Sequence, residues 1–301
     1  MSTVRELLGP AREYLDGKGV PSPKVDAEYL LAHVLGIKRL DLYLDHDRPL
    51  EPAEVARLRE LVRRRGRREP LAYVLGSWGF YGLDLRCDAR ALVPRPETEV
   101  LVEHCLALLA GSEAPCIADI GTGTGAIALA LATQLPQATV TAVDVSPGAL
   151  ALAAENAEAG GLAERVELLE GDLFAPLAGC RFDLIVSNPP YVATGDEVDP
   201  EVAGFEPAAL AVYAGDDGRT ILERLATGAG AHLNQGGRLA VELGDGQAPW
   251  FAGRLAGLGY ADVAITRDLR GVERVVSARL AAENGYVALA DECHVPMPHP
   301  L

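Results

Sequence analysis

The sequence lacks the long apolar segments that mark membrane and exported proteins. No stretch approaches about 18 uncharged apolar residues, the length of a membrane-spanning helix. Residues 1–19 contain no uninterrupted apolar segment of signal-peptide length. The sequence therefore predicts a cytoplasmic protein without a membrane partner.

Residues that would bind a metal or form a nucleophilic triad are also few. The cysteines are odd in number and never spaced as paired metal ligands, which predicts buried thiols in a reducing compartment and no metal site; they are Cys87, Cys105, Cys116, Cys180 and Cys293. None of the histidines lies in a recognisable nucleophile motif, which gives a serine–histidine–acid mechanism no support; they are His33, His46, His104, His232, His294 and His299.

Positive charge is scarce in the larger part of the chain. Residues 1–85 carry 14 Lys+Arg against 13 Asp+Glu, whereas residues 86–301 carry 13 against 30. Such an acidic surface repels a phosphate backbone, so stable DNA binding is not expected. One basic run, residues 63–68, is interpreted as a solvated helix end.

A chain of 301 residues is long enough for two hydrophobic cores. Residues 1–75 carry apolar positions at helical spacing, with helices expected from residue 4, over 24–35 and over 52–65. Residues 76–96 combine glycines, aromatics and alternating positions that are typical of a β-hairpin. We therefore expect a small helical domain over 1–75, followed by a hairpin linker over 76–96.

Helix and strand patterns alternate over residues 97–280, as in a parallel sheet covered on both faces. The expected strands are 116–120, 139–144, 166–170, 182–187, 237–243 and 273–280. The helices expected between them are about 126–134, 147–159, 218–233 and 247–258. Residues 281–301 are expected to form a loosely ordered tail.

A glycine-rich segment follows the first of these strands, where ligands bind in open α/β sheets. Its glycines allow the backbone to approach a ligand closely, and the next helix offers unpaired N–H groups. The residues predicted to bind a cofactor here are Asp119, Gly121, Thr122, Gly123, Thr124 and Gly125. The same segment also satisfies a dinucleotide-binding pattern, so a nicotinamide cofactor remains open at this point.

Acidic residues mark the ends of the next two strands. Asp144 follows the glycines by about 20 residues, where a carboxylate accepts hydrogen bonds from a ribose diol, although it can also cap the following helix. Asp172 is expected to accept from an adenine amino group, and Leu173 to cover the ring. These positions predict an adenosine ligand, and S-adenosylmethionine and NAD share that ribose.

The fourth strand ends in Asn188-Pro189-Pro190-Tyr191. The two prolines remove backbone donors and restrict Asn188 to extended geometry. Asn188 Oδ1 and the Pro189 carbonyl can then accept both hydrogens of an incoming planar NH₂ group, while Tyr191 lies against its flat face. We interpret all four residues as substrate-binding, Asn188, Pro189 and Tyr191 as catalytic, and Asn188 also as cofactor-binding. Nicotinamide chemistry has no need of this arrangement, which favours methyl transfer from S-adenosylmethionine.

With these motifs the chain resembles the class I methyltransferases of the HemK/PrmC family, the release factor glutamine methyltransferases. The resemblance covers nearly the whole chain. Two elements distinguish this family from other enzymes that share the tetrapeptide: the run over residues 93–99 and Phe205-Glu206-Pro207. It is also carried by Gly82-Leu83, the segment from Asp119, Val143-Asp144, the tetrapeptide from Asn188, and Ala209-Leu210.

The resemblance implies a Rossmann-like methyltransferase domain, a helical N-terminal domain that holds the substrate, and a β-hairpin linker. It implies S-adenosylmethionine as cofactor and, as substrate, the glutamine of the Gly-Gly-Gln loop of peptide chain release factors. We expect a monomer. Leu85 and Cys87 depart from the residue types expected in this hairpin, which predicts a differently packed cover over the methyl donor.

Several alternatives share parts of this pattern. A ribosomal-protein glutamine methyltransferase shares the tetrapeptide, and a DNA adenine-N6 methyltransferase makes the same demands on it. A non-catalytic adenosine-nucleotide scaffold or an NAD-dependent oxidoreductase would share the glycine-rich segment. Binding of S-adenosylhomocysteine rather than NAD separates the last two from a methyltransferase.

Overall fold

The computed structural model describes residues 2–281, and contacts divide the chain into two compact units. The helical unit comprises residues 1–78, 87–89 and 198–206. The sheet unit comprises residues 79–86, 90–197 and the chain from 207 onward. The contacts thus assign residues 198–206 to the helical unit, although these residues lie deep within the segment predicted as one domain. Apart from Ala281, the predicted tail over 281–301 lies outside the described residues.

Five helices form most of the helical unit: α1 (Val4–Asp16), α2 (Pro23–Leu35), α3 (Asp41–Leu44), α4 (Pro52–Gly66) and α5 (Leu71–Leu75). The three long helices expected from the apolar spacing are confirmed within one or two residues. Their apolar stripes meet in one core, in which Leu15, Leu30 and Leu61 are fully buried. Burial of these stripes stabilises helices that are individually too short to persist in water.

Local signals set the ends of these helices. At the start of α1, Thr3 Oγ1 accepts a hydrogen bond from the Glu6 backbone N–H, and Glu6 Oε2 accepts one from the Thr3 backbone N–H. This reciprocal pair satisfies two donors that the first helical turn leaves unpaired. At the end of α2, Gly36 adopts a φ of 63°, the left-handed conformation that terminates many helices.

The basic run at the end of α4 agrees only in part with its prediction as a solvated helix end, since Arg63 and Arg67 are exposed but Arg65 is not. Arg65 is only 3% exposed, and its Nε donates to Asp26 Oδ2 at 2.6 Å. Its Nη2 donates to Glu201 Oε1, also at 2.6 Å. Glu201 belongs to α9 (Pro200–Phe205), so this buried ion pair is one reason why residues 198–206 pack with the helical unit.

The predicted hairpin is confirmed as β1 (Ser77–Phe80) and β2 (Leu83–Arg86), which form a separate two-stranded sheet. Tyr81 and Gly82 connect them with φ angles of 48° and 81°. Positive φ at both central residues is the geometry whose twist matches that of a tight hairpin. The boundary between the two units falls inside β1.

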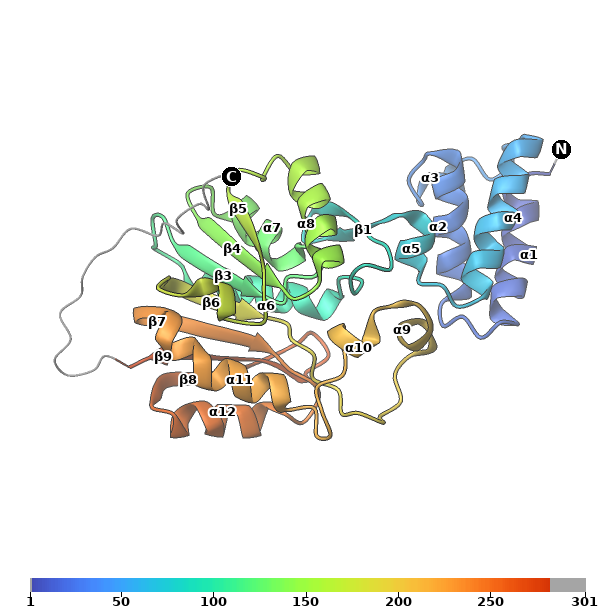
Figure 1. The fold of residues 1–301 in the computed structure, drawn as a ribbon. Coiled ribbons are helices and arrows are strands. Elements are labelled where there is room, and N and C mark those ends of the chain that lie inside the picture. The colour runs from blue at the N-terminus through green and yellow to red at the C-terminus, as the bar shows by residue number, and fades with distance from the viewer. Residues whose placement is uncertain (1, 282–301) are drawn as a thin grey trace. The chain divides into compact units, whose positions relative to one another are not determined.

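The sheet unit is built on seven strands in the order β5-β4-β3-β6-β7-β9-β8 (Figure 1). The strands are β3 (Cys116–Ile120), β4 (Thr139–Asp144), β5 (Val166–Glu170), β6 (Phe182–Ser187), β7 (Leu233–Glu242), β8 (Tyr260–Arg267) and β9 (Glu273–Leu280). Strands β3 to β7 are parallel, as predicted, whereas β9 pairs antiparallel with both β7 and β8. The predicted parallel sheet is therefore confirmed over β3 to β7, whereas its β9–β8 edge is antiparallel and β8 was not predicted.

Helices cover both faces of this sheet. Within residues 79–281, the α-helices of the unit are α6 (Pro96–Leu108), α7 (Ala126–Gln134), α8 (Pro147–Ala159), α10 (Ala208–Ala211), α11 (Thr220–Gly228) and α12 (Ala248–Gly257). Along β6, Leu184 and Val186 enter the core shared with α6 and α7, and Ile185 between them enters the core shared with α11 and α12. This alternation follows from the two-residue period of a strand. No helix within residues 2–281 is both long and apolar enough to span a membrane.

Candidate active site

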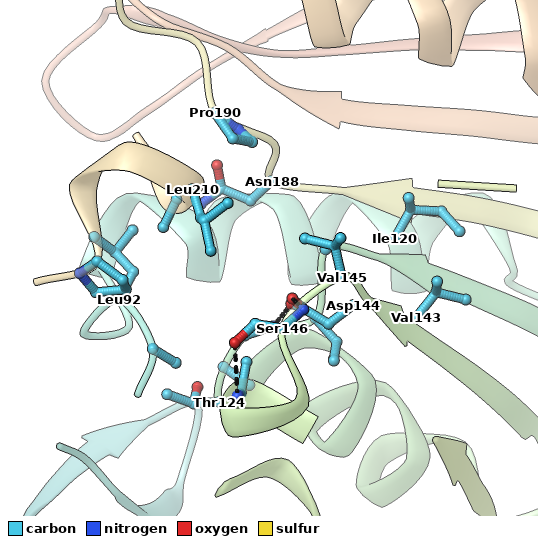
Figure 2. A pocket seen from close by; sticks show the side chains of 18 of the residues that line it. Leu92, Ile120, Thr124, Val143, Asp144, Val145, Ser146, Asn188, Pro190 and Leu210 are labelled. Atoms are coloured by element: carbon cyan, nitrogen blue, oxygen red, sulfur yellow. Dashed lines mark hydrogen bonds between the residues drawn. The ribbon is translucent and has the colours of Figure 1, made fainter. Parts of the chain in front are cut away.

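A pocket of the sheet unit opens where β3, β4, β5 and β6 end. Parallel strands bring their carboxyl ends to one edge, so the loops after them converge there. The lining residues that sequence reasoning had predicted are Gly121, Thr122, Gly123, Thr124, Asp144, Asp172, Leu173, Asn188 and Pro190. In Figure 2, Asn188, Pro190 and Leu210 lie on one side of the pocket, and Asp144, Val145 and Ser146 lie on the other.

The glycine-rich loop between β3 and α7 forms one wall. Gly121, Gly123 and Gly125 have φ angles of 78°, 57° and 83°, a region that side chains disfavour. A Cβ at Gly125 would lie 3.2 Å from the Leu129 side chain and 3.3 Å from Ala153, so this glycine also permits the close approach of α8. Positive φ at all three positions, and the close approach of α8 at Gly125, thus explain why glycines repeat in this segment of the sequence.

Asp144 ties this loop to the start of α8. Its Oδ2 accepts a hydrogen bond from the Gly123 backbone N–H at 2.8 Å, and its Oδ1 accepts one from the Ser146 backbone N–H at 2.9 Å. Ser146 Oγ in turn accepts from the Ala149 N–H and caps α8. Each carboxylate oxygen has further lone pairs that can accept from a ligand at the pocket. Asp144 therefore links the glycine-rich loop to Ser146, the residue that caps α8, and its contact with a ribose stays a prediction.

Asp119 differs from the other predicted cofactor contacts. It is fully buried and is not part of the pocket lining. Its Oδ2 accepts from Thr122 Oγ1 at 2.7 Å and from the Ala128 backbone N–H at 3.2 Å, while Oδ1 has no partner among residues 2–281. Burial raises the pKa of Asp119 to about 7. The structure thus corrects the direct contact to an indirect one, in which Asp119 shapes the glycine-rich loop from behind.

The Asp172–Leu173 turn lies at a third part of the wall. Leu173 has a φ of 54°, and both residues line the pocket. Asp172 Oδ2 accepts from Arg224 Nη2 at 2.7 Å, in a pair whose side chains are both about half exposed. Asp172, the predicted acceptor for adenine, is therefore paired with Arg224 through Oδ2. Among residues 2–281, Oδ1 has no arginine or lysine partner.

Asn188 lies on the wall opposite Asp144. Its Nδ2 donates to Thr98 Oγ1 at 3.0 Å. Thr98 itself is buried on α6 and also lines the pocket. Since Nδ2 is directed to Thr98, Oδ1 is the end of the amide that can accept from a ligand.

Pro189 and Tyr191 do not line the pocket in the way that the motif predicts. Only Asn188 and Pro190 of the tetrapeptide contribute to its wall. The Tyr191 ring packs against the core of α11 and α12, and burial raises the pKa of its hydroxyl to about 12. The Tyr191 carbonyl accepts from Gln247 Nε2 at 2.9 Å, which anchors the turn after the tetrapeptide.

Several lining residues were not singled out as a site by sequence reasoning. They come from segments without a visible ligand motif: Arg90, Ala91, Leu92, Val93, Pro94, Thr98, Val145, Ser146, Pro207, Leu210, Ala211 and Ile221. The first six lie in or next to the run over residues 93–99, and Pro207 and Leu210 lie in the two other elements of the family resemblance, so the resemblance was the signal available for these residues. Arg95, which belongs to the same run, also lines the pocket.

Leu85 and Cys87 were expected to alter the cover over the methyl donor. Both are almost fully buried, and neither belongs to the pocket lining. Leu85 packs in the core with Phe80 and Leu101. Neither departure therefore falls in the pocket lining, and an effect on the cover over the methyl donor stays a prediction.

A buried glutamate lies behind the Asn188 wall and was also missed. Glu242, the last residue of β7, is 1% exposed, and its Oε2 has no hydrogen-bond partner within the part of the chain that the structure describes. Burial raises its pKa to about 7, against the hydrogen-bonding influence of Thr98 and Asn188 and the charge of Arg274. No sequence motif indicates a site role for Glu242, because only the pairing of β6 with β7 places it near Asn188.

Comparison with known proteins covers both units. Residues 6–76 match the family described as PrmC N-terminal domain, and residues 96–205 match the methyltransferase small domain. The methyltransferase domain of delta-N METTL16 has the same fold, with a TM-score of 0.50 and 19% identity over 67% of this chain and 90% of that one.

Two curated relatives extend over almost the full length. The release factor glutamine methyltransferase of Geobacter sulfurreducens is 47% identical over 280 residues, which are 92% of this chain and 97% of the relative. That of Deinococcus radiodurans is 46% identical over 280 residues, which are 92% and 99%. The chain therefore belongs to the release factor glutamine methyltransferase family.

Proposed function

We propose that this protein transfers a methyl group from S-adenosylmethionine to the side-chain amide nitrogen of the glutamine in the Gly-Gly-Gln loop of peptide chain release factors. The observation that carries the proposal is the Asn188 amide at the pocket wall, with Nδ2 held by Thr98 and Oδ1 as the acceptor. Full-length relatives of that name support the substrate class.

The residues of the pocket fit an adenosine-containing donor. Asp144 offers carboxylate oxygens to a ribose diol, and the glycine-rich loop presents backbone without side chains in between. Asp172 and Leu173 are proposed to contact the adenine, as the sequence predicts, and Asp119 to support the loop. When bound, the donor supplies an activated methyl group on a positively charged sulfur.

The acceptor side must select nitrogen over oxygen. An amide nitrogen is a poor nucleophile, because its lone pair is delocalised into the carbonyl group. Asn188 Oδ1 on the pocket wall is proposed to accept one N–H hydrogen, and the Pro189 carbonyl, whose residue is not part of the pocket lining, to accept the other once the substrate is bound. These contacts orient the nitrogen and favour the positive charge that develops on it. No enzyme nucleophile is needed, and the proton departs after transfer. The contact of Tyr191 with the substrate stays a prediction.

The other expectations on partners follow the substrate. We propose that the helical unit holds the release factor, that the enzyme is a monomer in the cytoplasm, and that it does not bind DNA stably. The two methyltransferase alternatives, on a ribosomal protein and on DNA adenine, are not favoured, because the full-length relatives are named for release factors.

Mass spectrometry tests the proposal. The purified protein is incubated with S-adenosylmethionine and a release factor, and the peptide that contains Gly-Gly-Gln is fragmented. We expect one added methyl group on the glutamine side chain. An unmodified glutamine, with the donor bound, would contradict the assignment. Parallel incubations with a duplex oligonucleotide and with ribosomal protein would then identify either alternative.

A further inference from the structure

The Asn188 amide has two orientations of nearly equal shape, and only one of them can serve an NH₂ substrate. With Oδ1 toward the pocket, the side chain accepts a hydrogen from the substrate nitrogen. With Nδ2 toward the pocket, two NH₂ groups face each other as donors, and neither is satisfied. Something in the protein must therefore make one orientation more stable than the other.

Thr98 alone cannot make that choice. Its hydroxyl lies within hydrogen-bond distance of the Asn188 amide, at 3.0 Å from Nδ2. A hydroxyl both donates and accepts, so it could pair with either end of the amide. The direction of this bond depends on what else the Thr98 hydroxyl and the amide meet.

The buried Glu242 provides a group of fixed polarity. An ionised carboxylate only accepts hydrogen bonds. Glu242 is 1% exposed, its Oε2 has no partner among residues 2–281, and Thr98 and Asn188 both act on it as hydrogen-bonding neighbours. If Thr98 gives its hydrogen to Glu242, its oxygen is left to accept from Asn188.

We propose that Glu242 is a positioning residue, which acts through Thr98 to hold the Asn188 amide with Nδ2 inward and Oδ1 toward the substrate. This inference rests on the proposed function. The carboxylate also polarises the chain of hydrogen bonds, which makes Oδ1 a stronger acceptor for the positive charge that develops on the substrate nitrogen. Glu242 does not touch the reacting atoms.

The charged state of Glu242 is essential to this role. A protonated carboxyl is itself a donor and could reverse the direction of the Thr98 bond. The groups that act on it by charge are Arg274 from β9, which favours the ionised form, and Glu97 from α6, which opposes it. Tyr191 is also a neighbour, and its hydroxyl remains neutral because burial raises its pKa to about 12. Activity should therefore decline as pH falls through about 7, the pKa to which burial raises Glu242.

A simple packing role predicts something different. A carboxylate needed only for packing or folding would affect stability and donor binding when replaced, but not the turnover of molecules that fold and bind normally. If Glu242 instead sets the direction of the hydrogen bonds, its replacement lowers kcat and leaves the affinity for S-adenosylhomocysteine almost unchanged. In the wild type, kcat then has an acidic limb, a decline at acidic pH that depends on Glu242.

The test uses Thr98→Val and Glu242→Gln in the full-length protein, with Thr133→Val and Glu158→Gln as matched controls. Thr133 lies on α7, where its hydroxyl donates to the Leu129 carbonyl, and Glu158 is exposed on α8. We expect kcat on a release factor to fall about tenfold to a hundredfold in Thr98→Val, the scale of a misplaced catalytic contact. Thr98→Ser should recover most of that loss, because it restores the hydroxyl.

Glu242→Gln should lower kcat and abolish its acidic limb, while calorimetry with S-adenosylhomocysteine shows donor affinity like that of the wild type. The inference is overturned if folded Thr98→Val retains the kcat of its Thr133→Val control, or if Glu242→Gln keeps the acidic limb. Should Glu242→Gln fail to fold, the comparison of Thr98→Val with Thr98→Ser decides. Failure of the proposed function is recognised separately, since the wild type would then leave the glutamine unmodified.

Discussion

The two walls of the pocket are held by different means. On the donor side, Asp119 and Asp144 hold the loop mainly through backbone N–H groups, over short stretches of sequence. On the acceptor side, Asn188 is held by a side chain that lies 90 residues away, on α6. A wall built from backbone leaves a pattern of glycines in the sequence, whereas a wall built from side chains on distant elements leaves none.

Both walls nevertheless depend on a buried carboxylate behind the lining. Asp119 supports the glycine-rich loop, and Glu242 lies behind Asn188. In each case burial raises the pKa to about 7. We therefore expect replacements at the donor wall to change the affinity for S-adenosylmethionine, and replacements at the acceptor wall to change kcat.

The largest expected effect is on stability, through Asp119. Its pKa rises from 3.8 in the unfolded chain to about 7 in the folded protein. The folded state therefore keeps a proton that the unfolded state releases, so this contribution is complete below about pH 4 and is lost as pH rises through about 7. A shift of this size corresponds to at most about 4 kcal/mol.

Asp119→Asn should remove that dependence, because the amide is neutral and its oxygen still accepts from Thr122. Urea unfolding across this pH range measures the slope, with the exposed Asp84→Asn as control. A variant with the same pH slope as the wild type would show that Asp119 does not carry the buried charge.

The next effect concerns the acceptor wall. Asn188→Ala removes a positioned acceptor, which should cost about 2.7–4 kcal/mol of barrier, or a hundredfold to a thousandfold in kcat. Donor affinity and the free energy of unfolding should change little, because Asn188 lies at the pocket surface. Turnover of a release factor and calorimetry with S-adenosylhomocysteine provide the two readouts. Near-normal turnover of this variant would refute the role of the amide.

A smaller effect is expected from Asp144→Ala on the donor wall. Hydrogen bonds to a charged group contribute about 1.5–3 kcal/mol, so the KM for S-adenosylmethionine should rise about tenfold to a hundredfold. At saturating donor, kcat should stay close to the wild-type value. If kcat fell while the KM for the donor was unchanged, the assignment of donor binding to this wall and of turnover to the other would be wrong.

The smallest effect is expected from Arg224→Ala. Its pair with Asp172 is exposed on both sides, and such pairs contribute less than about 1 kcal/mol. The donor KM should therefore change by less than about fivefold. A larger loss, measured by the same donor titration, would show that the pair orders Asp172 for its contact with the ligand.

The sequence predicted the fold in those parts where local chemistry decides it. Strands β3 to β6 and β9 have the predicted bounds, and in β3, β4 and β6 these bounds enclose runs of mostly buried residues, which are distinctive in a sequence. Strand β8, in which only Tyr260 is buried, was missed. Its pairing with β9 supplies the structure that its own sequence does not indicate.

The site, like the fold, was predictable where local sequence signals mark it. Residues 121–124 of the glycine-rich loop, Asp144 and Asn188 were found from their positions after strands, and they line the pocket, whereas Gly125 does not. Asp119, adjacent in sequence, is buried outside the pocket lining, where its Oδ2 accepts from Thr122 and Ala128. The contacts of Thr98 and Glu242 with Asn188 could not be predicted, although Thr98 lies in the run over residues 93–99, since only the folded protein brings these residues together.

The most direct test of the account is a crystal structure of the enzyme with S-adenosylhomocysteine and a release factor. We predict that the amide nitrogen of the Gly-Gly-Gln glutamine lies within hydrogen-bond distance of Asn188 Oδ1 and of the Pro189 carbonyl, and faces the sulfur. A glutamine bound elsewhere, or one that meets Asn188 through its oxygen, would contradict it.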